Sequence, residues 1–339
     1  MLASKPPVVV ALVGLVAVLV TVVIAVGVGS TTVAPLDVLR VLADHVLPFD
    51  VASSPIADPI IWNIRLPRVL TAFAAGAALG MGGVALQGLF RNPVADPQLV
   101  GLSATAAIGV MIGLWIGWEA GGPVAGILGG VVAGILGASA VRWIATSTQG
   151  DPSRFILAGI GFGVAVSAMV AAAAIAIHDP RIPDVPFWFV GGLGASTWGT
   201  VLWTTLFAGA SLLVVWRFAR RLDVFSLGMA SARHLGIDVA VVTTATLMSV
   251  GAGVGAAVGA AGVIAFVGLV AAHGARALVG DHHRTSLPAG FVLGGMFLVT
   301  ADAMGRVIGG RFEVPVGLVT AAIGGPFLLW LIVRRRLGT

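Results

Sequence analysis

Repeated apolar runs are the feature that most restricts what this chain can fold into. A helix of about twenty mainly apolar residues crosses the hydrocarbon core of a bilayer. Only 10% of the residues are charged, against about 25% in a soluble globular chain. We predict a single all-α transmembrane domain over residues 1–339, with about ten spans near residues 8–29, 66–89, 98–117, 122–141, 152–177, 200–216, 239–258, 262–278, 288–308 and 315–333.

The first apolar run lies close to the N-terminus, where a cleaved secretory signal is the rival interpretation. A signal has an apolar region of about 7–15 residues, whereas residues 8–29 provide 22, so we predict a retained helix. The mixed stretch 30–64 predicts an extracytoplasmic loop with a short helix over residues 35–46. The proline-containing stretch 178–198 predicts a second loop.

Positive charge is distributed unevenly between the two sides that ten spans define. With the N-terminus inside, 13 of the 19 lysine and arginine residues fall on the cytoplasmic side and 6 fall outside. This bias follows the positive-inside rule. It predicts a multi-pass protein of the cell membrane with both termini in the cytoplasm. The net charge of +5 is therefore explained by membrane lipid as the surroundings, without nucleic acid as a partner.

Several kinds of chemistry are missing from the sequence. It contains no cysteine, which excludes disulfides, thiolate metal sites and cysteine nucleophiles. Its single lysine, Lys5, does not follow the glycines that a phosphate-binding P-loop requires. No Ser-His-Asp order or paired carboxylate cleft stands out. We therefore predict no catalytic residue and no bound metal, and we place any ATPase on another polypeptide.

The stretch from Arg65 to Gly109 carries the most specific pattern in the chain. Two arginines flank Leu-Pro, a glycine-rich helix with a late glutamine follows, and a proline turn leads into a second glycine-rich run. The residues of this pattern are Arg65 to Arg68, Gln87, Arg91 to Ala95, Pro97 and Gly101 to Ala106. Their order closely resembles the signature of the FecCD family, the permease subunits of ABC importers for iron-siderophores, haem and cobalamin. Val94 and Thr105 replace the Leu and Gly that are usual in the family.

The resemblance implies a division of labour among subunits. A second permease subunit, identical or paralogous, would complete the translocation path. Two cytoplasmic ATPase subunits would bind ATP and Mg²⁺, so this chain would hold no cofactor. An extracytoplasmic substrate-binding protein would deliver the cargo. The resemblance also implies a role in the path or its gate for residues at family positions, which here are Gln87, Asn92, Pro93 and His273.

His273 lies in a segment that resembles a further family motif, together with Arg276. Ala272 replaces the proline that is usual there. A lone histidine has no partner ligands for a metal. We therefore interpret His273 as a family structural residue near the cytoplasmic gate.

Three arginines lie at the predicted outer mouth: Arg65 and Arg68 one helical turn apart, and Arg306 at the end of the ninth span. A guanidinium can make paired, charge-assisted bonds to a carboxylate. The resemblance implies that arginines at these positions receive acidic residues from the two lobes of the binding protein. The alternative is snorkelling to lipid phosphates, which accounts for most arginines at a membrane boundary. With the family match, we predict docking.

The polar segment 222–239 is the longest interruption in the second half of the chain, and it resembles the family's coupling loop. The matching positions, with the neighbouring arginine, are Leu227, Gly228, Ala232, Arg233, Leu235 and Gly236. Met229 stands where the family usually has Glu. A short amphipathic helix here could present one face to a groove on an ATPase. The alternative is a solvated connector, and we predict coupling.

Asp302 is the only acidic residue well inside an apolar run, and Arg306 lies four residues later. On a helix the two share a face, so we predict a structural ion pair. A secondary transporter driven by ions could use such an aspartate, and that class is the alternative reading of the whole chain.

The sequence therefore predicts the permease subunit of an ATP-driven importer that forms the path for a chelate delivered by a binding protein. The predicted path carries little side-chain charge, which suits a bulky chelate better than a bare ion that needs oxygen ligands along its way. An iron-siderophore is the first choice from the resemblance. Haem and cobalamin are the alternatives.

Overall fold

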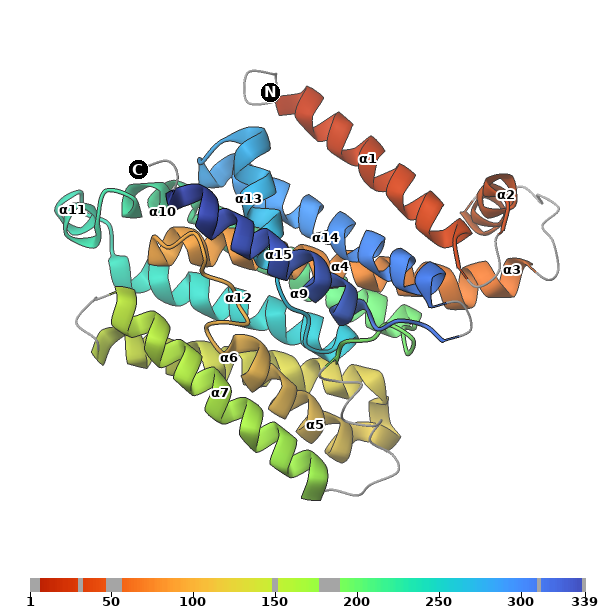
Figure 1. The fold of residues 1–339 in the computed structure, drawn as a ribbon, viewed down its shortest axis with the longest axis horizontal. Helices are drawn as coiled ribbons and strands as arrows, with labels where there is room; N and C mark the ends of the chain where they lie inside the picture. Colours follow the sequence, from red (N-terminus) through yellow and green to blue (C-terminus); the bar gives the residue numbers. More distant parts are fainter. Residues whose placement is uncertain are drawn as a thin grey trace.

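The computed structural model describes residues 7–29, 33–46, 57–147, 152–176, 190–309 and 312–336, and all regular structure in these ranges is helical. Figure 1 shows the long helices lying side by side in one bundle. The predicted loop 178–198 falls mostly outside the described residues. The helices are α1 (Pro7–Gly27), α2 (Pro35–Val46), α3 (Ala57–Pro59), the π-helix η1 (Ile60–Arg65), α4 (Leu66–Phe90), α5 (Leu102–Gly121), α6 (Pro123–Ser147), α7 (Pro152–Ala176), α9 (Trp198–Arg217), α10 (Ala219–Phe225), α11 (Met229–His234), α12 (Val239–Ala261), α13 (Val267–Val279), α14 (His283–Ile308) and α15 (Val316–Arg336).

Seven stretches of the described chain are long and apolar enough to cross a membrane. Three shorter apolar helices lie within α5, α7 and α13. Together they agree with the predicted number of about ten spans, and the all-α polytopic fold class is confirmed. The predicted short helix over residues 35–46 is α2.

The chain's described ends lie at one end of the bundle. In Figure 1, α1 begins and α15 ends on the side that carries α10 and α11, while α2 and α3 lie at the opposite side. We call these the α10/α11 end and the α2 end. The arrangement fits an even number of crossings, and which end faces the cytoplasm stays a prediction.

Helix α4 forms the centre of the bundle because its residues are small. The apolar stretch of the helix is 89% buried inside the protein. The helix packs against α9, α12, α13 and α14. A side chain cannot be added at Gly76, since its Cβ would lie 2.3 Å from the carbonyl oxygen of Gly294 in α14. Backbone contact through glycine is a common way for helices to pack tightly in lipid.

Two of the predicted spans begin later than expected, each after a non-helical break. The third span was expected from residue 98, but α5 begins at Leu102, after a non-helical segment over residues 91–101 that we call the re-entrant loop. The eighth span was expected from residue 262, but α13 begins at Val267, after a non-helical segment over residues 262–266 that we call the junction. Both boundary predictions were wrong because hydropathy does not register a break in an apolar run.

The ninth span also begins earlier than predicted. Pro288 was expected at its first turn, yet α14 starts at His283 and contains Pro288 inside it. A proline lacks the N–H that would bond to the carbonyl four residues earlier. Here that carbonyl, on Arg284, accepts a hydrogen bond of 3.1 Å from Trp216 Nε1 instead. The indole of α9 thus satisfies the group that the proline leaves free.

The re-entrant loop returns into the bundle after α4 ends. The backbone of Gly83 in α4 touches Gly268 of α13, and Asp96 of the loop reaches the same place. Gly83 lies seven residues before the end of α4, or about 10 Å along the helix axis. The loop therefore folds back by roughly that distance, and it meets the junction inside the bundle.

Candidate functional site

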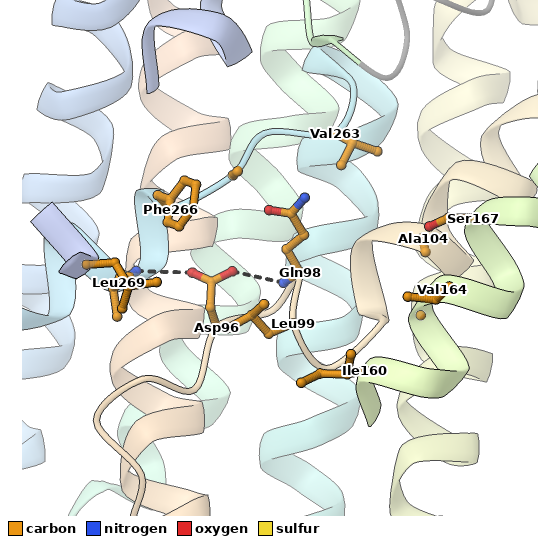
Figure 2. Close-up of a pocket in the computed structure, with 13 residues that line it drawn as sticks. Asp96, Gln98, Leu99, Ala104, Ile160, Val164, Ser167, Val263, Phe266 and Leu269 are labelled. Carbon is orange, nitrogen blue, oxygen red and sulfur yellow. Dashed lines mark hydrogen bonds between the residues drawn. The ribbon is translucent and has the colours of Figure 1, made fainter. Parts of the chain in front are cut away.

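A hollow of about 460 Å³ lies where the re-entrant loop and the junction meet (Figure 2). Its walls come from these two segments and from α5, α7, α13 and α15. Non-helical backbone at membrane depth is tolerated where it is buried in protein or lines a cavity. The two broken spans and the hollow therefore belong to one feature.

The lining of the hollow is mostly apolar. Val164 of α7, Phe266 of the junction and Leu328 of α15 are examples, and the polar side chains in the lining are Asp96, Gln98 and Ser167. None of these lining residues forms a nucleophile–base pair or a set of metal ligands. The hollow can enclose the apolar body of a cargo and offer it a few polar contacts, but it has no groups arranged for bond-making chemistry.

Asp96 is the charged residue in this lining, and it is 5% exposed. One carboxylate oxygen accepts the backbone N–H of Gln98 at 2.9 Å, and the other accepts the N–H of Leu269 at 3.1 Å. Figure 2 shows the carboxylate between these two donors.

The junction has an unusual backbone conformation at both of its ends. Gly262 has φ +74°, which a glycine adopts without strain, but Phe266 has φ +67°. For a bulky residue this left-handed conformation costs of order 1–2 kcal/mol. The Phe266 side chain packs against Gly324 of α15, where a Cβ would lie 2.2 Å from the Cβ of Phe266. Close packing thus fixes a strained residue in the wall of the hollow.

The four residues predicted for the path or its gate lie outside this lining. Gln87 is buried near the end of α4, and its Oε1 accepts a hydrogen bond from Arg276 of α13. Asn92 closes a turn by accepting the N–H of Val94 at 3.0 Å, and Pro93 lies between them. The role of these positions in a gate stays a prediction.

His273, the fourth predicted path or gate residue, has structural contacts. Its Nδ1 lies 2.9 Å from the carbonyl oxygen of Leu269, one turn earlier in α13. Its ring meets the ring of Phe327 in α15 edge-on, with centroids 5.8 Å apart. The ring contact joins α13 to α15 next to the hollow.

The predicted coupling segment forms a distinct projection at the α10/α11 end (Figure 1). Two short helices, α10 and α11, are separated by Gly228 with φ +104°, a conformation that a side chain would strain. Leu227 is 67% exposed and Leu235 is 64% exposed, whereas Ala232 is buried against the protein. The segment therefore offers apolar side chains outward, and its contact with an ATPase stays a prediction.

An aspartate anchors this projection to the bundle. Asp223 of α10 accepts the backbone N–H of His283 at 2.8 Å and lies 2.6 Å from Nδ1 of the same residue, at the start of α14. The imidazole lies over Gly88 of α4, where a Cβ would lie 1.9 Å from Nε2. The sequence analysis did not identify this contact, because Asp223 and His283 are 60 positions apart.

The arginines predicted for docking have internal partners in this structure. Arg65 and Arg306 are 6% and 4% exposed. Together they donate hydrogen bonds of 2.6–3.2 Å to the carbonyl oxygens of residues 25–28, at and just beyond the end of α1. Cations are favourable at a helix C-terminus, where carbonyl groups lack partners. Docking through Arg65 and Arg306 would require these bonds to open, and it stays a prediction.

Arg68, the third of these arginines, makes the strongest ion pair at the α2 end. Its guanidinium bonds to Asp302 at 2.8–3.2 Å and to Glu313 at 2.7 Å. The predicted contact of Asp302 with Arg306 is also present, with Nε 3.0 Å from Oδ2, but without hydrogen-bond alignment. The main partner of Asp302 is therefore Arg68. Helical spacing does not predict this pair because the two residues lie on different helices.

A histidine and two aspartates gather near the surface of the α2 end. Asp44, His45 and Asp58 bring their ligand atoms within 4.8 Å of one another. The ring of His45 stacks on Trp62 with centroids 4.0 Å apart, and its Nδ1 lies 3.5 Å from Asp58. A surface His–Asp pair accounts for this arrangement, and we assign no metal to it.

The sequence analysis did not single out Asp96, the central residue of the hollow. A signal was present, because Asp96 precedes Pro97 inside the stretch Arg65 to Gly109, which carries the most specific pattern of the chain. Its partner Leu269 is 173 positions away, a distance that no local pattern bridges.

The fold and the hollow together define a class of protein. Non-helical segments that meet beside a cavity inside a multi-pass helical bundle occur in membrane transport proteins. The chain matches the model of the FecCD transport family over residues 17–334, and it belongs to that family. The predicted family is thus confirmed, and the chain is a membrane-embedded permease subunit of an ABC importer, which is not itself an enzyme.

Relatives support this assignment along most of the chain. The hemin transport system permease protein of Yersinia pestis is 36% identical over 281 residues, which cover 81% of this chain and 84% of the relative. The iron(3+)-hydroxamate import system permease protein of Bacillus subtilis is 33% identical over 281 residues, covering 82% and 72%. Other relatives are import permeases for vitamin B12 and molybdate.

A solved structure has the same fold. A chain described as a metal-chelate type ABC transporter in an inward-facing conformation superimposes with a TM-score of 0.80 and 25% identity. The alignment covers 96% of this chain and 99% of the solved chain.

Proposed function

We propose that this chain forms one half of the translocation path of an ATP-driven importer for an iron-siderophore-type chelate. The observation that carries the proposal is the mainly apolar hollow between the two broken spans, in a chain of the FecCD family. A bare ion needs oxygen ligands along its path. Asp96 alone among the lining residues could supply a charged oxygen, and both of its oxygens already accept backbone N–H groups.

The choice of cargo rests on relatives and on the hollow together. The relatives include permeases for hemin, iron(3+)-hydroxamate, vitamin B12 and molybdate. A small oxyanion gains little from an apolar wall that contains a carboxylate. Haem and cobalamin are the alternatives within the same class, because each is bulky enough to fill an apolar hollow.

A second permease subunit would close the open side of the hollow. Val164 of α7 and Leu329 of α15 are 64% and 66% exposed, on two helices that contribute to its lining. In lipid, such a surface can associate with an apolar partner through close van der Waals packing. The partner is either a second copy of this chain or a paralogue.

Two cytoplasmic ATPase subunits would supply the energy, with ATP and Mg²⁺ bound on them and no cofactor on this chain. The projection formed by α10 and α11 would enter a groove on each ATPase. Asp223 would carry the movement to α14 and α4 through His283. A binding protein would deliver cargo at the α2 end, which places both termini in the cytoplasm of a cell membrane.

Two experiments test this function. The tagged chain is purified in mild detergent from its native host, and co-purifying proteins are identified by mass spectrometry. We expect a P-loop ATPase in roughly equal amount to the permease. The purified complex is then reconstituted with its binding protein, and uptake of a ferric trihydroxamate, haem, cobalamin and molybdate is compared. We expect ATP-dependent uptake of the ferric chelate.

Two other results would contradict the proposed class or cargo. Uptake that needs a proton or sodium gradient and no ATP would replace the proposal with a secondary transporter. ATP-dependent uptake of haem or cobalamin alone would keep the class and change the cargo.

A further inference from the structure

Asp96 joins the re-entrant loop to the start of α13, two segments that are far apart in the chain. It belongs to the re-entrant loop, and it accepts the N–H of Leu269 in the first turn of α13, directly after the junction. Its other oxygen accepts the N–H of Gln98 within its own loop. A single carboxylate therefore joins two neighbouring parts of the wall of the hollow (Figure 2).

The start of α13 depends on this carboxylate for a cap. The first N–H groups of a helix have no partner within the helix, and a side chain at the N-cap position usually supplies one. The N-cap residue of α13 is Phe266, which makes no capping hydrogen bond. Asp96 supplies the missing acceptor from another part of the chain.

The surroundings leave little room for a different side chain. A Cβ on Gly268 would lie 2.8 Å from Oδ2 of Asp96, and a Cβ on Gly83 would lie 2.3 Å from the carbonyl oxygen of Gly268. Glycine at both positions lets α4, α13 and the loop come together around the carboxylate. The packing around Gly83 and Gly268 therefore leaves room for an acceptor side chain as short as that of aspartate.

We propose that Asp96 is a positioning residue for transport, which acts through Leu269 to hold the junction against the re-entrant loop and so sets the width of the hollow. The predicted effect of Asp96 on transport rests on the proposed function. Without the carboxylate, α13 loses its cap and the strained junction is released from the loop. Water then reaches the hollow more readily, and ATP hydrolysis becomes less tightly coupled to cargo transport.

The absence of cysteine from the natural sequence gives a clean background for testing this. Ser167 lines the hollow on α7 and is replaced by a cysteine of nearly the same size (Ser167→Cys). Reaction of the purified chain with a water-soluble maleimide then reports access to the hollow. The measurement needs neither cargo nor ATPase.

Asp96→Ala should raise the labelling rate roughly 5-fold or more, the effect of losing a helix cap. Asp96→Asn keeps one acceptor oxygen and should give a smaller increase. The matched control is Asp238→Ala, because Asp238 caps α12 by accepting the N–H of Val241 at 3.0 Å on the exposed surface. The control should leave the labelling rate unchanged.

Equal labelling rates in all variants would overturn the proposal, and so would an equal increase with Asp238→Ala. If Asp96→Ala does not fold, the isosteric Asp96→Asn still decides the outcome. In the reconstituted importer, Asp96→Asn should lower the maximal uptake rate and raise the ATP consumed per cargo, with KM unchanged. The chain could instead show the expected order of labelling rates, with Asp96→Ala highest and Asp96→Asn next, yet no ATP-dependent uptake. That result would overturn the proposed function and leave the positioning role intact.

Discussion

Arg68 and Asp302, 234 positions apart in the sequence, form a forked ion pair with three hydrogen bonds of 2.8–3.2 Å. The side chain of Asp302 is 2% exposed and that of Arg68 is 12% exposed. The pair ties the beginning of α4 to the last turns of α14. Since α4 is the centre of the bundle, the pair fixes the α2 end of the whole structure.

Loss of this pair should be costly. Arg68→Ala leaves the buried carboxylate of Asp302 with the poorly aligned Arg306 only, and removal of one partner from a buried pair costs about 3–5 kcal/mol. We expect a clear fall in the thermal unfolding temperature of the detergent-purified chain. The control is Arg40→Ala, which breaks the exposed pair with Asp37 and should cost less than about 1 kcal/mol. Equal losses in the two variants would contradict the account.

Gly83 should not tolerate even one methyl group. In Gly83→Ala the new Cβ meets the backbone of Gly268 at 2.3 Å, and overpacking of this kind costs about 1–3 kcal/mol. The control is Gly209→Ala in α9, where nothing lies within 4 Å, and which should stabilise the helix by about 0.4–1 kcal/mol. Thermal unfolding of the two variants should therefore shift in opposite directions. A Gly83→Ala protein as stable as the natural chain would show that α13 is not packed as described.

Asp223 should matter more for coupling than for cargo binding. Asp223→Ala removes the two contacts that hold α10 to the start of α14. In the reconstituted importer we expect the ATP consumed per cargo to rise several-fold while KM for the cargo stays the same. Asp281→Ala, at a side chain that is 92% exposed, is the matched control. A change in KM alone would place Asp223 in cargo binding instead.

The exposed leucines of the coupling segment should determine ATPase binding. Leu227→Glu with Leu235→Glu places two charges on the apolar surface that we propose enters the ATPase groove. We expect less ATPase to co-purify with this double variant than with the natural chain. Leu36→Glu, at a similarly exposed leucine of α2, should not change the amount. Undiminished co-purification of the double variant would show that the ATPase binds elsewhere.

The fold class was predictable from the sequence because the length and hydropathy of each span are local properties. The Arg65–Gly109 pattern also identified the family, which the family match confirms. The breaks in the third and eighth spans were missed for a physical reason. The residues of the junction, such as Val263 and Phe266, are as apolar as those of a helix, although α12 ends with its C-cap Gly262, whose φ is +74°.

The central contacts of the site were beyond sequence reasoning because they are non-local. Asp302 was assigned to Arg306 by helical spacing, whereas its best-aligned partner comes from α4. Asp96 meets the first turn of α13, and Asp223 meets His283, only after the bundle has formed. Arg65 and Arg306 are likewise buried because they bond to the end of α1. The residues next to them in the sequence do not indicate where that end lies.

Cargo protection of a cysteine in the hollow tests the central claim most directly. Val164 and Met169 of α7 are 64% and 63% exposed, but only Val164 lines the hollow. In the reconstituted importer, Val164→Cys should react with a water-soluble maleimide at a rate that falls when cargo and binding protein are added and that changes with ATP. Met169→Cys should react at the same rate in every condition. If cargo and ATP leave both rates unchanged while uptake proceeds, the path lies elsewhere and the hollow is not part of it.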